Sequence, residues 1–441
     1  METSRSNRRY ALVASTVGTT LEVYDFFIYG TAAALVFSTQ FFPSLDPAAG
    51  LLAAFLTYAV GYVARPLGAL IFGHFGDRIG RKSTLLVTML LMAVPTVLIG
   101  CLPNYEQIGL AAPIILCVLR ILQGVAYGGE WGGAVLLAVE TAPRGRKSFF
   151  GSLPSAGAAA GLVLSTVAWA ATSRLPEADF QQWGWRLPFV ASVVLMAVGI
   201  FVRLKVEETP DYRQTRSAGQ IPRAPILDVF RTAKASMLWC IGARVFENSW
   251  FSIVLVFLVG YAVSAAGISK MEVLNAIALG AAVSVPTLLL VGLLGDRVGQ
   301  KVLYTAGAIA LAAWTWTMFD LVRDGQAKLA LVVGLGLIWP FVYGPQAALF
   351  AAQFDARIRY TALSVATQLA GILAGAIAPL IATVLMNRAN GSTLPIEIYL
   401  TVLALAGLAS TYFMKPHQVL DEPAAPVQTT AARAAVVSTS A

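Results

Sequence analysis

Seven ionisable side chains lie inside long apolar segments of this sequence: Glu22, Asp25, Arg65, Arg120, Glu130, Arg244 and Glu247. A charge in such surroundings is costly and rare, so each of these residues is a candidate for function by default. Both histidines of the chain lie outside the apolar segments. Any transfer of protons must therefore use carboxylates, with arginine as a partner that a carboxylate can gain or lose.

Two of the carboxylates belong to the first apolar segment. Glu22, Asp25 and Tyr29 follow the spacing i, i+3 and i+7, which places them on one face of a helix. A carboxyl group that is removed from water holds its proton more readily, whereas a neighbouring arginine favours the ionised form. Asp25 and Glu22 are therefore candidates for binding a coupling proton. For each, the alternative is a buried salt bridge that only holds helices together.

A second cluster surrounds Arg120, near the middle of another apolar segment. The planar guanidinium can grip a carboxylate through two parallel hydrogen bonds, so Arg120 is a candidate both for proton coupling and for binding an anionic substrate. Gln123 and Tyr127 follow on the same segment and are further candidates for the binding site. Glycines at 124, 128, 129, 132 and 133 allow another helix to approach closely. Glu130 lies nearer one end of the segment, where packing or gating is as reasonable as chemistry.

A third cluster lies in the apolar segment over 236–262 and consists of Arg244, Glu247, Asn248 and Trp250. These residues offer a cation, an anion, an amide and an aromatic ring, so we expect them to contribute to the same binding site. Tyr29, Tyr127 and Trp250 could line its walls. Aromatic side chains in apolar segments also commonly face lipid or the protein core, which is the alternative for all three.

The composition places these residues in a membrane. Hydrophobic residues make up 57% of the 441-residue chain and charged residues only 12%, and the mean hydropathy is +0.72. A water-soluble protein of this length needs far more charge to cover its surface. The net charge of +8 therefore belongs to loops beside the membrane and does not indicate a nucleic-acid partner. The three cysteines lack metal-ligand spacing, so no metal site is expected. The absence of a nucleophile–base pair argues against an enzyme.

A run of about 20 apolar residues is long enough to span a bilayer as a helix. The sequence predicts twelve spans, over 11–39, 49–73, 83–102, 110–139, 149–172, 186–204, 236–262, 271–294, 302–322, 329–350, 361–386 and 395–414. Of the 31 Lys and Arg residues, the loops of one side hold only Arg174, Arg186, Lys270, Arg323, Lys328 and Arg388. Because cytoplasmic loops carry the excess of basic residues, both termini are expected in the cytoplasm.

A short basic phrase occurs twice between apolar segments. Residues 73–82 read Gly-His-Phe-Gly-Asp-Arg-Ile-Gly-Arg-Lys and residues 292–301 read Gly-Leu-Leu-Gly-Asp-Arg-Val-Gly-Gln-Lys. The copies are about half the chain apart, which indicates a duplicated unit, although two ordinary cytoplasmic turns are the alternative. Asp beside Arg at a helix end provides capping and complements the helix dipole. We expect these hinges to control a conformational change through Gly73, Gly76, Asp77, Arg78, Gly80, Arg81 and Lys82 in the first copy and Asp296 and Arg297 in the second.

The same offset also relates two of the buried charges to each other. It relates Asp25 to Arg244, so these two residues could face one central cavity from equivalent helices. Arg65 precedes the first hinge in the same apolar segment. Its two interpretations are a residue that lines a gate and a member of a fixed ion pair.

The repeated phrase resembles the loop between helices 2 and 3 of the major facilitator superfamily and its weaker echo between helices 8 and 9. The resemblance implies an all-α membrane protein with two pseudo-symmetric six-helix bundles that rock about a central site. Residues 1–204 and 236–415 are the expected bundles, and residues 205–235 are the expected cytoplasmic linker. The segment 416–441 is rich in Ala, Thr, Ser and Pro, and we expect it to be disordered.

Three further strings are similar to the metabolite:H⁺ symporter branch of that superfamily: Glu22-x-Tyr24-Asp25-Phe26, Gly-Gly-Glu-x-Gly-Gly-Ala over 128–134, and Gly184-Trp185-Arg186-x-Pro188-Phe189. Members of that branch take α-ketoglutarate, citrate, shikimate, aromatic acids, or proline and betaine. The resemblance implies proton-driven uptake of a small carboxylated metabolite. Three arginines inside spans favour an anion over a cation.

Several alternatives follow from the same resemblance. Proton-coupled uptake of proline or betaine is one, although the osmosensors of that branch carry a long C-terminal coiled coil, for which this sequence has no heptads. A passive facilitator and a non-transporting sensor of the same fold are others, but a sensor gains nothing from seven buried charges. The expected setting is a monomer in a bacterial inner membrane. Its expected partners are an organic anion, a proton and lipid, with no cofactor beyond the proton.

Overall fold

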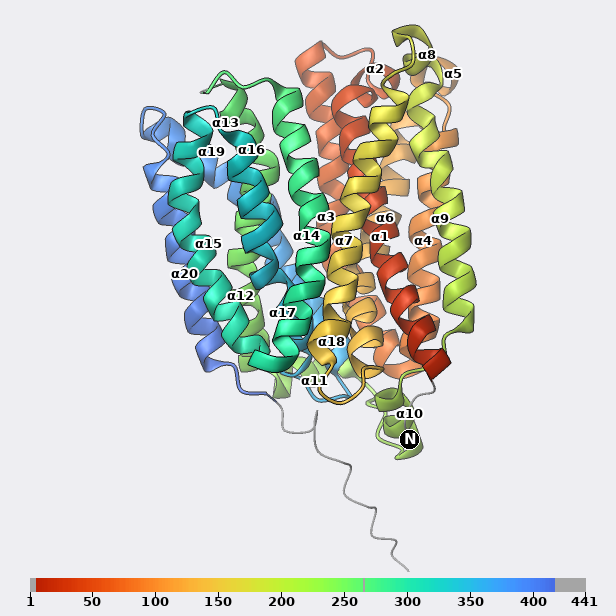
Figure 1. Ribbon diagram of the computed structural model, residues 1–441. Helices are drawn as coiled ribbons and strands as arrows, with labels where there is room; N and C mark the ends of the chain where they lie inside the picture. The colour runs from red at the N-terminus through yellow and green to blue at the C-terminus, as the bar shows by residue number, and fades with distance from the viewer. Residues whose placement is uncertain (1–4, 265, 417–441) are drawn as a thin grey trace, which may run out of the picture.

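The computed structural model describes residues 5–264 and 266–416. Twelve helices among them are long and apolar enough to cross a membrane, which confirms the predicted fold class. Figure 1 shows the helices side by side in two groups, one coloured red to yellow and the other green to blue. The first span, α1 (Arg5–Leu35), begins at the end of the molecule where the last, α20 (Leu394–Phe413), finishes (Figure 1).

The first half of the chain supplies six spans. They are α1, α3 (Pro47–Ile79), α4 (Arg81–Cys101), α6 (Ala111–Glu140), α7 (Lys147–Thr172) and α9 (Leu187–Lys205), the last preceded by the 3₁₀ turn η1 (Gly184–Arg186). Three short helices connect them at the end far from the termini: α2 (Phe37–Phe41), α5 (Tyr105–Ile108) and α8 (Glu177–Gln182) (Figure 1).

The second half supplies the other six spans, and three of them contain a π-helical turn. The interrupted spans are α12 (Lys234–Ser252), η2 (Ile253–Phe257) and α13 (Leu258–Ser264); α16 (Ala327–Leu331), η3 (Val332–Ile338) and α17 (Trp339–Ala351); and α18 (Arg359–Ala370), η4 (Gly371–Ala376) and α19 (Ala378–Arg388). The regular spans are α14 (Lys270–Val298), α15 (Gln300–Arg323) and α20. Turns of this kind are rare and frequently occur at functional sites.

The segment between the halves contains two short helices, α10 (Pro210–Ser217) and α11 (Pro225–Thr232). Each begins with proline, whose fixed φ and missing N–H suit the first turn of a helix. The hydroxyl of Tyr212 in α10 donates a hydrogen bond to the carbonyl of Arg78 at 2.7 Å. The linker therefore docks against the end of α3. The tail predicted to be disordered lies outside the described residues from residue 417 onward.

Both hinges are shorter than the sequence predicted. α3 stays helical to Ile79 and α4 begins at Arg81, so Gly80 alone makes the first turn, with φ 110°. Gly299 makes the equivalent turn between α14 and α15, with φ 97°. A side chain is disfavoured at such values of φ, which explains glycine at both positions. The first predicted span was too long, because α1 ends at Leu35 and the short helix α2 follows.

Glycines bring α3 and α6 into close contact. A Cβ atom on Gly124 would overlap the carbonyl oxygen of Gly61, and one on Gly128 would overlap that of Arg65. Backbone atoms cannot move aside as the tip of a side chain can. The close approach therefore fixes Arg65 on α3 relative to Arg120 on α6.

We expect Gly128→Ala to destabilise the protein by about 1–3 kcal/mol, because the added methyl overpacks the contact between α3 and α6. Gly50→Ala is the matched control, since a Cβ there meets its nearest atom at an ordinary 3.5 Å. Thermal unfolding of the detergent-solubilised protein, followed by circular dichroism, measures both variants. Equal melting temperatures for the two variants would contradict the packing argument.

Candidate functional site

A cavity of about 620 Å³ lies between the two halves of the chain. Helices α1, α3, α6 and α7 supply one side of its wall, and α12, η2, α14, η3, α17, α18 and η4 supply much of the other. The charged residues on the wall are Glu22, Arg65, Arg244 and Glu247. The cavity therefore lies at the interface between the halves, and both halves contribute charged residues to its wall.

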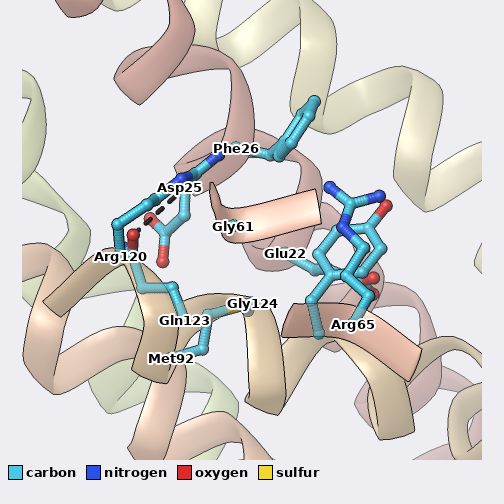
Figure 2. A pocket seen from close by; sticks show the side chains of 10 residues that line it. Glu22, Asp25, Phe26, Gly61, Arg65, Met92, Arg120, Gln123 and Gly124 are labelled. Atoms are coloured by element: carbon cyan, nitrogen blue, oxygen red, sulfur yellow. Dashed lines mark hydrogen bonds between the residues drawn. The ribbon is translucent and has the colours of Figure 1, made fainter. Parts of the chain in front are cut away.

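A smaller pocket of about 10 Å³, close to the space of one water molecule, lies within the first half. It contains Asp25 and Arg120, and it shares Glu22, Phe26, Arg65 and Tyr127 with the large cavity. Figure 2 shows this pocket with Asp25 beside Arg120 and with Arg65 well apart from both. The expectation that Asp25 and Arg244 line one cavity is not met, because Asp25 lies on the wall of the small pocket alone.

A chain of hydrogen bonds connects Arg120 to Asp25. Arg120 Nη1 donates to Gln123 Oε1 at 3.2 Å, which is the dashed line in Figure 2. Gln123 Nε2 donates to Thr96 Oγ1 at 2.7 Å, and the Thr96 hydroxyl donates to Asp25 Oδ2 at 2.8 Å. Within the described chain, the two charged groups make no direct ion pair under 4.0 Å. Sequence reasoning missed Thr96, because a lone threonine in an apolar span carries no signal of its own.

Aromatic rings surround the guanidinium of Arg120. Its central carbon lies 4.1 Å from the ring centre of Tyr29, 5.0 Å from that of Tyr58 and 5.3 Å from that of Phe26. The Tyr29 hydroxyl donates to Thr57 Oγ1 at 2.7 Å. Tyr29 and Gln123, predicted to bind substrate, are thus placed around Arg120 and not on the wall of the large cavity.

Arg244 meets its partners on the opposite side of the large cavity. Its Nη1 lies 2.9 Å from Glu247 Oε2 and donates to Gln346 Oε1 at 2.5 Å. Trp339 Nε1 donates to the other oxygen of Glu247 at 2.8 Å. The predicted cluster on this helix is therefore real in part: Arg244, Glu247 and Asn248 line the cavity.

Trp250 does not reach the cavity. Its side chain is fully buried inside the second half, and its indole N–H donates to Thr315 Oγ1 at 3.1 Å. Trp250 was predicted to line the binding site, and this prediction is wrong because its ring packs in the core of the second half. Tyr127, in contrast, lines the large cavity as predicted.

Glu130 belongs to a buried ion pair inside the first half. Its carboxylate contacts the guanidinium of Arg203 and accepts a hydrogen bond from Thr88 Oγ1 at 2.5 Å. Arg203 also donates to the carbonyl of Leu85. The sequence placed Arg203 near the end of a span and gave it no role, whereas it is 2% exposed. This contact supports the packing interpretation of Glu130.

The end of the molecule that carries the hinges is closed by carboxylates that cap helices across the two halves. Asp77 on α3 accepts hydrogen bonds from the backbone N–H of Tyr360 at 3.2 Å and of Thr361 at 2.9 Å, and from the Thr361 hydroxyl at 2.8 Å. Tyr360 and Thr361 lie in the first turn of α18. A carboxylate at a helix N-terminus satisfies free N–H groups and complements the helix dipole.

The second hinge repeats this contact with the halves exchanged. Asp296 on α14 accepts hydrogen bonds from the backbone N–H of Ser148 at 2.8 Å and of Phe149 at 3.2 Å, at the start of α7. Asp77 is 1% exposed, whereas Asp296 is partly exposed. The two caps are therefore alike in kind and differ in burial and in the number of hydrogen bonds that they accept.

Ion pairs surround the first cap. Arg81 Nε lies 3.5 Å from Glu140 Oε2, and Arg359 Nη1 lies 3.1 Å from Glu140 Oε1. Arg359 also reaches Asp211 in the linker at 2.7 Å, and the Glu208 carboxylate accepts from the backbone N–H of Arg81 at 3.0 Å. The network joins both halves and the linker.

The other hinge residues divide into two groups. Gly73 and Gly76 pack directly against Thr361 and Tyr360, so side chains there would separate the halves. Arg78 and Arg297 are exposed, and the Arg78 side chain lies 3.4 Å from His74 on the same helix. Lys82 is half-buried and contacts other segments: its Nζ donates to the Leu204 carbonyl of α9, and its backbone N–H donates to the Glu208 carboxylate in the linker.

Comparisons with known proteins agree with this architecture. The sequence profile of the family described as Sugar (and other) transporter matches residues 10–220. The shikimate transporter of Escherichia coli (strain K12) is 36% identical over 424 residues, which cover 94% of this chain and 96% of the relative. The proline/betaine transporter of the same organism is 31% identical over 422 residues, which cover 92% of this chain and 83% of the relative. These relatives are transporters and not enzymes.

Solved structures show the same fold. The proton:xylose symporter XylE bound to 6-bromo-6-deoxy-D-glucose superposes with a TM-score of 0.75 at 16% identity, over 93% of this chain and 96% of that one. The inward-open form of XylE from E. coli superposes less well, with a TM-score of 0.63 at 15% identity, over 92% of this chain and 96% of that one.

The two caps allow a direct comparison. We expect Asp77→Asn to open the hinge end more than Asp296→Asn, because Asp77 accepts three hydrogen bonds and Asp296 two. Hydrogen bonds to a charged group contribute about 1.5–3 kcal/mol each, so the difference of one bond corresponds to roughly a 10- to 150-fold shift in population. Double electron–electron resonance between spin labels at the exposed, equivalent positions Ser83 and Val302 measures the opening. Equal distance distributions for the two variants would count against this ranking.

Proposed function

This chain belongs to the major facilitator superfamily of transporters, and we propose that it imports a small carboxylated metabolite together with a proton by alternating access. The observation that carries the proposal is a cavity between the two halves that has buried carboxylates and arginines on its wall and in the adjoining small pocket. The hinge end of the molecule is closed. In transporters of this kind, substrate and coupling-ion sites lie near the middle of the membrane at the interface of the repeats.

The proton-binding role falls to Asp25, with Glu22 as the second candidate. Asp25 is 2% exposed and is connected to Arg120 through Gln123 and Thr96. A proton on Asp25 would weaken this chain of polar contacts, and its loss would strengthen the attraction between Asp25 and Arg120. Glu22 lines both the small pocket and the large cavity. A proton could therefore bind in a place that senses whether the cavity is occupied.

The substrate class follows from the cavity and from the relatives. Arg65 lies on the cavity wall with no carboxylate within 4.0 Å among the described residues, which favours an anion, and a relative of 36% identity is named a shikimate transporter. Uptake of proline or betaine with a proton is the second candidate function, because Glu22 and Arg65 offer charges of both signs and another relative is named a proline/betaine transporter. A passive facilitator of the same fold would carry the same substrate without a proton.

The cellular setting is part of the proposal. The protein would act as a monomer in a bacterial inner membrane, with both termini and the hinge end on the cytoplasmic side, because the basic residues gather there. It would need no cofactor beyond the coupling proton. The cavity would then be reached from outside when the hinge end is closed.

The test is transport by the purified protein in liposomes that contain a pH-sensitive dye. Shikimate, α-ketoglutarate, proline and glycine betaine are added one at a time. Internal acidification upon addition of a carboxylic acid supports symport of an organic acid. Acidification with proline or betaine alone moves the protein to the second candidate function. Entry of substrate without a change of pH replaces the proposal by facilitation.

We expect Asp25→Asn to abolish accumulation against a gradient while exchange of labelled for unlabelled substrate continues. With one proton per substrate, a gradient of one pH unit can drive about tenfold accumulation, and the variant should reach only equal concentrations. Asp324→Asn, at an exposed loop position, is the control and should accumulate normally. Undiminished accumulation by Asp25→Asn would remove Asp25 from the coupling mechanism.

A further inference from the structure

The charges on the wall of the large cavity are not equally available to a ligand. Arg244 and Glu247 lie 2.9 Å apart and neutralise each other, and Gln346 takes a further N–H of Arg244. Arg120 lies outside the large cavity and bonds to Gln123. This leaves Arg65 as the cation on the wall that has no carboxylate within 4.0 Å among the described residues.

Aromatic rings hold Arg65 in place without using its donors. The central carbon of the guanidinium lies 3.6 Å from the ring centre of Tyr127, 3.8 Å from that of Tyr62 and 4.6 Å from that of Phe26. The side chain is 7% exposed, and its Nε has no hydrogen-bond partner in the described chain. Rings attract the face of a guanidinium, whereas its N–H groups point outward in its plane. The group is therefore fixed in orientation and still able to bind an anion.

We propose that Arg65 binds the carboxylate of the transported metabolite, and that the site takes a monocarboxylate bearing neutral polar groups. This inference rests on the proposed function and names the substrate class of the same site. One unpaired cation on the wall matches one negative charge. A second carboxylate would meet no second cation free of an ion pair among the described residues of the wall, and an ionised Glu22 would repel it.

The second half of the chain supplies neutral hydrogen-bonding groups to the same cavity. A Cβ atom built on Gly371 would lie 3.8 Å from both Asn248 Nδ2 and Gln368 Oε1, so both amides lie beside Gly371. Both line the cavity, together with Ser252 and Thr367. Amides and hydroxyls bind hydroxyl and carbonyl groups without requiring charge. A hydroxylated monocarboxylate would thus have its acid end on Arg65 and its neutral end at these groups.

The test is equilibrium binding to the purified full chain in nanodiscs, measured by isothermal titration calorimetry. The probes are shikimate, its neutral methyl ester, α-ketoglutarate and glycine betaine. For the unaltered chain, we expect shikimate to bind more tightly than the other three. We expect Arg65→Gln to weaken shikimate binding by roughly 30-fold or more, because it removes a buried charge partner, and to leave binding of the ester within about threefold.

Two further variants sharpen the result. Arg65→Lys keeps the charge but loses the planar donor set, so its affinity for shikimate should fall between those of the unaltered chain and Arg65→Gln. Arg323→Gln, at an exposed position that pairs with Asp320, is the control and should bind every probe normally. Retained binding of the ester shows that a variant is folded.

Each of the remaining results would refute a specific part of the proposal. Equal shikimate binding by Arg65→Gln and the unaltered chain removes Arg65 from the site and leaves the proposed function standing. Loss of both acid and ester binding in Arg65→Gln assigns Arg65 a structural role, which also overturns the proposal. Tighter binding of α-ketoglutarate or betaine than of shikimate refutes the monocarboxylate class. If the unaltered chain binds no carboxylate at all, this inference and the proposed function fail together.

Discussion

The closed end of the molecule depends on carboxylates that cap helices of the opposite half. Asp77 caps α18 and Asp296 caps α7, so a carboxylate of each half accepts hydrogen bonds from the N-terminal N–H groups of a helix in the other half. The turns that aim the two aspartates require glycine, at Gly80 and Gly299. The duplicated phrase thus encodes a reciprocal contact.

The sequence predicted what depends on local pattern. Apolar runs predicted the twelve spans, and the repeated phrase predicted two equivalent hinges, because hydropathy and turn chemistry act over short distances. The ion pair between Glu130 and Arg203 was not predictable, since it depends on which helices pack together. Thr96 and the direction of Trp250 were missed for the same reason: a helix has several faces, and the sequence does not say which one meets a neighbour.

Three arginines that looked alike in the sequence have three different surroundings. Arg244 is paired with Glu247, Arg120 is linked through neutral groups to Asp25, and Arg65 lies among aromatic rings. Counting buried charges is therefore a weak guide to ligand binding; what matters is which charge remains without a partner. The division also separates the site suited to the proton from the site suited to the substrate, with Glu22 on the wall of both pockets.

The π-helical turns make the two halves of the transporter differ in how easily their helices bend. In the described chain they occur only in spans of the second half, and Leu255, Leu335 and Gly375 within them face the large cavity. A wider turn has a looser backbone ladder and bends more easily than a regular one. A ligand between the halves thus contacts a stiffer wall that carries Glu22 and Arg65 and a more pliant wall that carries the amides of Asn248 and Gln368. Deformation caused by binding should concentrate in the pliant wall, while the geometry around Asp25 keeps its shape.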